Sequence, residues 1–77
     1  MAITLIFFGQ LVDITGSTTL MVEEARDTDR LTQYLHQHFP ALRDVKYAIA
    51  VDKKIIRENT SLNNGATVAL LPPFSGG

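Results

Sequence analysis

The sequence contains no cysteine and no tryptophan, and its charges nearly balance. Without cysteine, the chain has no disulfide, no thiolate metal ligand and no thiol nucleophile, which fits a reducing compartment. Seven Lys and Arg residues oppose eight Asp and Glu residues, for a formal net charge of −1. This balance argues against the broad basic surface of a nucleic-acid-binding protein, so we expect no nucleic-acid partner.

Long hydrophobic runs are also missing. The apolar stretch at residues 3–8 has no basic leader, and it is too short for a signal peptide or a membrane span. The 77 residues are enough for one domain, and a composition of 45% apolar and 19% charged residues is typical of globular proteins. We therefore expect a cytoplasmic protein with no membrane partner.

Hydrophobic periodicity predicts strands and one main helix. Strands are expected at residues 2–9, 17–23, 46–52, 53–58 (a short one) and 67–71. Residues 10–16 predict one helical turn or a loop. In residues 26–40, Asp27 or Thr28 can cap a helix, Leu31, Leu35 and Phe39 recur at helical spacing, and Pro40 ends the element.

This order of elements predicts an α+β domain, because one helix can cover only one face of a sheet. We expect a β-grasp, or ubiquitin-like, fold with a four- to five-stranded mixed sheet. The domain is predicted to span residues 1–71, and residues 72–77 are predicted to form a flexible C-terminal Gly-Gly tail.

Strand alternation divides the apolar residues between the two faces of the sheet. The helix side is assigned Ile3, Leu5, Phe7, Leu31, Leu35, Phe39, Ile49, Val51, Val68 and Leu70. The opposite side is assigned Ile6, Phe8, Ala48, Ala50 and Leu71, with Ile55 nearby. An open antiparallel face is usually polar, so this second apolar face indicates either a docking surface or scattered exposed side chains.

The last residues, Pro72, Pro73, Phe74, Ser75, Gly76 and Gly77, form the most unusual motif. Terminal glycines can reflect ordinary fraying. Alternatively, a Gly-Gly end can thread a channel too narrow for other residues, and the prolines keep its base extended. Such an arm suits a carrier that delivers its terminal carboxyl group into another protein's active site, after activation by ATP.

Other candidate sites are weak. His36 and His38 are two residues apart on the helix and cannot chelate one ion together, so we expect no metal. Asp13, Glu23 and Glu24 look like solvated loop charges, and Gly9, Gly16 and Gly65 lack the spacing of a phosphate-binding loop. The chain is therefore predicted to have no catalytic site of its own.

The segments "LIFFGQLVDITG", "YAIAVD" and "NNGATVALLPPFSGG" resemble the small, sulfur-carrier subunit of molybdopterin synthase. This family is related to the thiamin sulfur carrier and to ubiquitin-like proteins. The resemblance spans the whole chain, and the Pro-Pro-x-Ser-Gly-Gly ending is its most specific part.

The resemblance implies a sulfur-transfer cycle in molybdenum cofactor biosynthesis. An adenylating enzyme related to ubiquitin activators would use Mg-ATP to activate Gly77, which then becomes a thiocarboxylate; the chain itself would bind no cofactor. The sulfur would pass to a cyclic pyranopterin precursor in the large subunit of the synthase, within a heterotetramer. By this analogy Phe8, Ile55, Leu71 and Phe74 contact the partners.

Two other functions stay open. One is a sulfur carrier for a different product, such as thiamin, an amino acid or a tungsten cofactor. The other is a ubiquitin-like interaction module whose tail is never activated.

Overall fold

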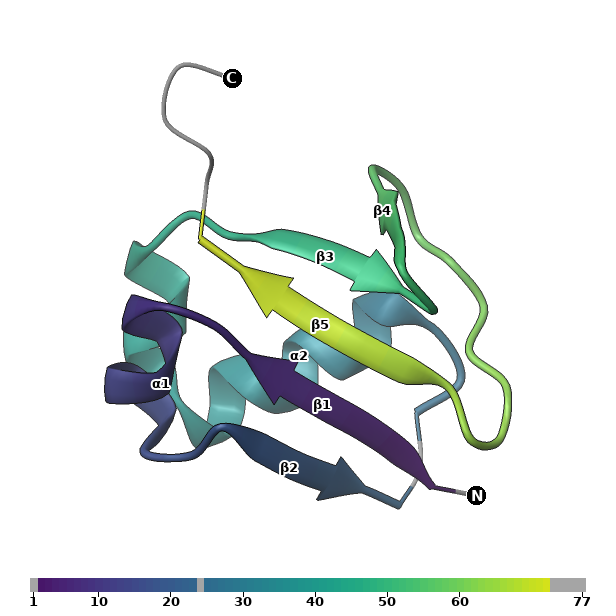
Figure 1. Ribbon diagram of the computed structural model, residues 1–77, viewed down its shortest axis with the longest axis horizontal. Helices are drawn as coiled ribbons and strands as arrows, with labels where there is room; N and C mark the ends of the chain where they lie inside the picture. Colours follow the sequence, from purple (N-terminus) through teal and green to yellow (C-terminus); the bar gives the residue numbers. More distant parts are fainter. Residues whose placement is uncertain (1, 24, 73–77) are drawn as a thin grey trace.

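A computed structural model describes residues 2–23 and 25–72 and places five strands in one sheet, with a helix across one face (Figure 1). The elements are β1 (Ile3–Phe7), α1 (Gln10–Thr15), β2 (Thr19–Val22), α2 (Thr28–His38), the 3₁₀ helix η1 (Pro40–Asp44), β3 (Ala48–Val51), β4 (Lys54–Ile56) and β5 (Thr67–Leu71). Each predicted strand is present, and the bounds predicted for β5 match those observed.

The strand order is β2-β1-β5-β3-β4. β1 and β5 run parallel at the centre, and the other neighbouring strands are antiparallel. A long helical crossover separates β2 from β3, and α2 lies behind the sheet in Figure 1. The predicted α+β, β-grasp architecture with a mixed sheet is therefore confirmed.

The core lies between the sheet and α2. The inward residues of β1 and β5 are almost completely buried, and Leu31 and Leu35 of α2 cover them. Phe39 and Ile49, also predicted to face the helix side, are only partly buried at the edge of this core. Burying a large aliphatic side chain contributes about 1.5–3 kcal/mol to the free energy of unfolding, so this layer supplies most of the stabilisation.

Three buried leucines escaped the sequence analysis: Leu11 in α1, Leu42 in η1 and Leu62 in the loop before β5. Of the two alternatives predicted for residues 10–16, the helical turn is present, as α1 with Gly16 at its C-cap, and the buried Leu11 anchors it. The assignment of Asp13 to a loop was therefore wrong, because Asp13 lies in the exposed face of α1.

Side chains fix the start of α2. Asp27 is the N-cap: its Oδ1 accepts a hydrogen bond of 2.9 Å from the backbone N–H of Arg30, and this bond lowers the pKa of Asp27. Asn59, from the loop after β4, accepts a second bond of 2.9 Å from the N–H of Asp29. The Asn59 bond ties the loop between β4 and β5 to the start of α2.

The turn between β3 and β4 is strained. Asp52 and Lys53 have φ angles of 49° and 75°, a left-handed conformation that costs a non-glycine residue about 1–2 kcal/mol. The strain is offset by two bonds between Asp52 and Thr67: the Asp52 N–H donates to the Thr67 carbonyl (2.8 Å), and the Asp52 carboxylate accepts from the Thr67 N–H (3.0 Å).

We expect Lys53→Gly to stabilise the protein by about 0.5–1 kcal/mol, because glycine adopts a positive φ without steric cost. Urea unfolding would measure the change. The matched control is Lys54→Gly, one residue further along: it should destabilise the protein, since glycine weakens a strand. Loss of stability in both variants would contradict the turn-strain explanation.

Candidate protein-docking face

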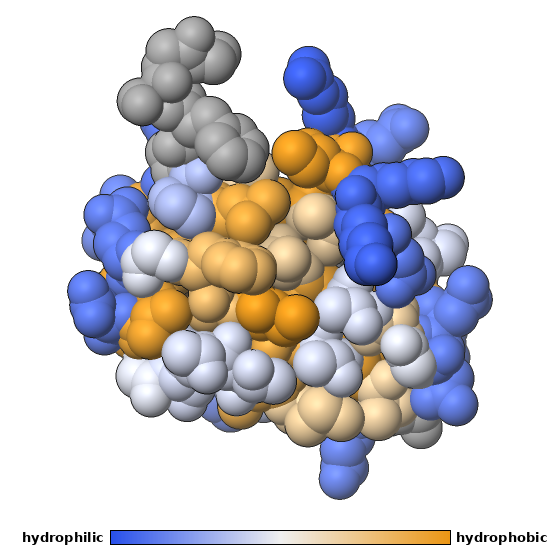
Figure 2. All heavy atoms as spheres, in the orientation of Figure 1, coloured by the Kyte–Doolittle hydropathy of each residue, from blue (hydrophilic) through white to orange (hydrophobic). Residues whose placement is uncertain are grey.

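The candidate site is the face of the sheet that α2 does not cover. Figure 1 is viewed from this side, and Figure 2 shows hydrophobic side chains gathered over its middle, with polar ones around them. The strand pairing places Ile6, Ala69, Ala50 and Ile55 in one row across β1, β5, β3 and β4. Two residues further along β5, Leu71 pairs with Ala48 on the same face of the sheet.

The predicted contact residues differ in exposure. Phe8 and Ile55 are 44% and 54% exposed, whereas Ile6 and Leu71 are half-buried. Exposed apolar residues next to each other on a sheet favour protein association. We call Ile6, Phe8, Ile55 and Leu71, with Ala48 and Ala69 between them, the docking face.

Two details of this face were not foreseen. Ala50 points to the open side but is only 6% exposed, so it supports its neighbours rather than leaving room for a partner. Met21 is 57% exposed and pairs with Thr4, on the same side of the sheet as Ile6. The alternation of Leu20 and Val22 towards the core already implied that Met21 faces outward.

The end of β5 brings the base of the tail to the docking face. The N–H of Phe8 donates to the carbonyl of Leu70 (3.1 Å), and the ring of Pro72 packs beside Gly9. Gly9 has a φ of 58°, and a Cβ atom there would lie 3.0 Å from Cγ of Pro72, so glycine makes this close approach possible. The chain therefore leaves the sheet next to Phe8. The other predicted tail residues, Pro73, Phe74, Ser75, Gly76 and Gly77, lie outside the described residues.

The two histidines each have an aromatic neighbour. Nε2 of His36 lies 2.8 Å from the hydroxyl of Tyr47, and the pKa of that hydroxyl is raised by burial. The ring of His38 lies against Tyr34, with 4.2 Å between centroids. The His36–Tyr47 contact joins α2 to the segment before β3, whereas the Tyr34–His38 contact lies within α2. Within residues 2–23 and 25–72, no group of three or more His, Cys, Asp or Glu residues could hold a metal ion.

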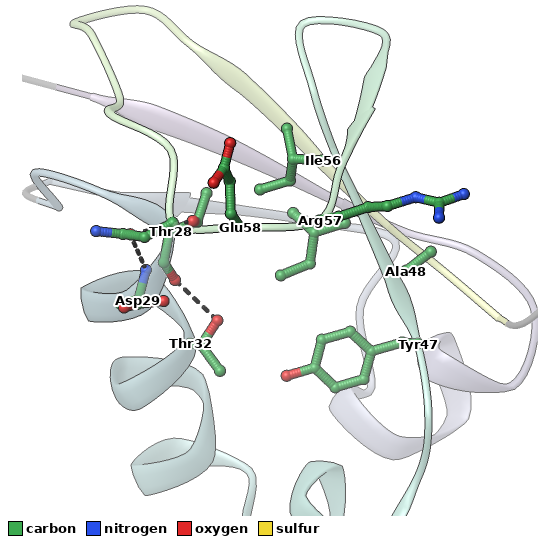
Figure 3. Close-up of a pocket in the computed structure, with 10 residues that line it drawn as sticks. Thr28, Asp29, Thr32, Tyr47, Ala48, Ile56, Arg57 and Glu58 are labelled. Carbon is green, nitrogen blue, oxygen red and sulfur yellow. Dashed lines mark hydrogen bonds between the residues drawn. The ribbon is translucent and has the colours of Figure 1, made fainter.

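A hollow of about 240 Å³ lies on the helix side, between the start of α2 and the β3–β4 hairpin (Figure 3). Thr28, Thr32 and Tyr47 line it, and the hydroxyl of Tyr47 points towards α2. Two of these hydroxyl groups have hydrogen-bond partners within the fold: that of Thr32 donates to the carbonyl of Thr28 (2.8 Å), and that of Tyr47 lies 2.8 Å from Nε2 of His36. No helix in the described ranges is long and apolar enough to cross a membrane.

Comparison with solved structures shows the same fold in other proteins. The small archaeal modifier protein 1 of Methanosarcina acetivorans is 21% identical, with a TM-score of 0.85 over 99% of this chain and 96% of that one. The modifier protein 1 of Haloferax volcanii is 22% identical, with a TM-score of 0.80 over the whole of both chains. At these identities, the likeness concerns the fold.

A third structure is more similar in sequence. It is the complex of subunits 1 and 2 of molybdopterin-converting factor from Helicobacter pylori 26695, with 29% identity and a TM-score of 0.74 over the whole of both chains. The sequence pattern of the ThiS family matches residues 5–77, almost the entire chain. The resemblance drawn from the sequence is thereby confirmed: the chain belongs to the ThiS family, whose ubiquitin-like fold it shares.

Proposed function

We propose that this protein is a sulfur carrier in molybdenum cofactor biosynthesis and that Gly77 is its reacting residue. The observation that carries the proposal is the family match, which extends through the Gly-Gly ending. The 29% identity to a chain from a complex of molybdopterin-converting factor subunits supports this choice of pathway.

The chemistry begins with an unreactive group, because a carboxylate has no good leaving group. An adenylating enzyme related to ubiquitin activators joins the Gly77 carboxylate to the α-phosphate of Mg-ATP and releases pyrophosphate. A sulfur donor then attacks the acyl carbon, AMP leaves, and Gly77 becomes a thiocarboxylate. Since the cycle consumes ATP, we place it in the cytoplasm.

The docking face explains how such a tail is delivered. Phe8 and Leu71 lie beside the point where the tail begins, so a partner that covers them also receives the tail. We propose that the large subunit of molybdopterin synthase docks there, in a heterotetramer with two central large subunits. The thiocarboxylate sulfur then attacks the cyclic pyranopterin precursor, and water finally restores the Gly77 carboxylate. Two such rounds build the dithiolene.

Intact mass spectrometry of the protein from its native cells tests the proposal. We expect a fraction of the molecules to carry one sulfur in place of one oxygen, located in the C-terminal peptide. The control is protein from cells that lack the adenylating enzyme, in which only the carboxylate should be found. If the carboxylate form alone is found in both strains, the sulfur-carrier function fails and the interaction-module alternative gains.

A reconstituted reaction separates the molybdenum pathway from the others. Thiocarboxylated protein, mixed with the large subunit and the cyclic pyranopterin precursor, should form the dithiolene product and return to the carboxylate. A thiocarboxylate that forms in cells but gives no product here would assign the protein to another pathway, such as thiamin synthesis.

A further inference from the structure

Cationic side chains concentrate beside the docking face. Lys53, Lys54 and Arg57 are three of the chain's seven Lys and Arg residues, they fall within five positions, and all are exposed. Ile55, one of the most exposed hydrophobic residues of the described chain, lies between them. Figure 2 shows strongly hydrophilic side chains next to the hydrophobic area. We call Lys53, Lys54 and Arg57 the basic rim.

The open face of the sheet carries no charge of its own. Within the strands, its outward residues are Thr4, Ile6, Thr19, Met21, Ala48, Ala50, Ile55, Thr67, Ala69 and Leu71. Charge at its β4 edge therefore comes from the hairpin. A partner that covers the apolar centre of the face would therefore also contact the charged side chains at the β4 edge.

The acidic neighbours in the hairpin do not cancel the rim. The carboxylate of Asp52 accepts the backbone N–H of Thr67, so it is held against β5. In β4, Ile55 pairs with Ala50 and faces the docking face, whereas Lys54 pairs with the core residue Val51 and starts from the α2 side of this exposed edge strand. The side chains of Arg57 and Glu58 point in different directions in Figure 3, and that of Arg57 extends away from the hollow. Lys53 and Arg57 therefore supply exposed positive charge on either side of Ile55, and Lys54 adds to it from the outer edge of β4.

We propose that the basic rim recognises an acidic surface on the large subunit that receives the tail. This inference rests on the proposed function and deepens it by naming the chemistry of the partner's surface. Ile55 supplies an apolar anchor, and the cations around it attract carboxylates at the margin of the contact. Charges at an interface margin act mainly on the association rate and on the choice of partner.

The test compares two variants with the same change in net charge. The first is Lys53→Glu/Lys54→Glu/Arg57→Glu. The control is Arg26→Glu/Arg30→Glu/Arg43→Glu, in which the replaced side chains are also exposed but belong to α2, η1 and the segment before α2. Association with the large subunit from the same genome is followed by stopped flow at low and high salt. Circular dichroism checks the fold of each variant.

We expect the rim variant to associate about tenfold or more slowly at low salt and to lose most of the salt dependence, while the control stays close to wild type. If the charge-reversal variant unfolds, the neutral variant Lys53→Gln/Lys54→Gln/Arg57→Gln is used instead. It should also associate more slowly than wild type at low salt. Equal slowing in the rim and control variants, or no slowing of the rim variant with the large subunit, would overturn the inference. A wild-type protein that does not bind the large subunit at all would instead refute the proposed function.

Discussion

Gly76→Val is expected to abolish activation of Gly77 while leaving thermal stability nearly unchanged. Valine adds a branched side chain one residue before the reacting carboxylate. A channel that admits only a bare backbone would then exclude the tail, and valine also loses the backbone angles open to glycine. Since chain ends outside the core contribute little to folding, the melting temperature should not change.

ATP–pyrophosphate exchange with the adenylating enzyme measures this effect directly. The matched control is Ser75→Ala, one residue earlier, which removes a hydroxyl without adding bulk and should retain exchange. Deleting Gly77 should abolish exchange as completely as Gly76→Val. A large fall in melting temperature for either tail variant would show that the tail packs into its own domain, contrary to the delivery-arm hypothesis.

Phe8→Asp should leave the domain folded and weaken docking by about two orders of magnitude or more. In the free protein the new carboxylate lies in water, because Phe8 is 44% exposed. In a complex it would be buried without a partner charge, which costs several kcal/mol, and each 1.4 kcal/mol changes the dissociation constant about tenfold. Calorimetry with the large subunit and with the adenylating enzyme measures the loss.

Met21→Asp is the control for this experiment. Met21 is 57% exposed on the same side of the sheet, but β2 places it at the edge remote from the β3–β4 hairpin. The Met21→Asp variant should therefore bind both partners with affinities closer to wild type than those of Phe8→Asp. Leu71→Asp should also weaken docking, with some loss of stability because Leu71 is half-buried. Tight binding by Phe8→Asp would place the docking surface elsewhere, and an unfolded Phe8→Asp would mean that the faces are assigned wrongly.

The docking face is expected to bind both the adenylating enzyme and the large subunit, one after the other, because the single tail must enter the active site of each. The large subunit should therefore compete with the adenylating enzyme for this protein. A stable ternary complex of the three would contradict the shared face.

The sequence determined the elements and their inward faces. Alternation in β1 and β5 identified Ile3, Leu5 and Leu70 as core residues, and helical spacing identified Leu31 and Leu35. These patterns are local, because a strand repeats every two residues and a helix every 3.6. In a regular segment with one apolar face, the sequence alone therefore identifies the buried side.

Only the tertiary structure decided which segments meet. The parallel pairing of β1 with β5 joins the two ends of the chain, and it alone brings Phe8 beside the base of the tail. Leu11, Leu42 and Leu62 lie in short or irregular segments that lack a full period, so their burial depends on long-range contacts. Ala50 and Met21 both lie on the open face, yet Ala50 is buried and Met21 is exposed. Burial on that face depends on the size and position of the neighbouring side chains, which only the tertiary structure gives.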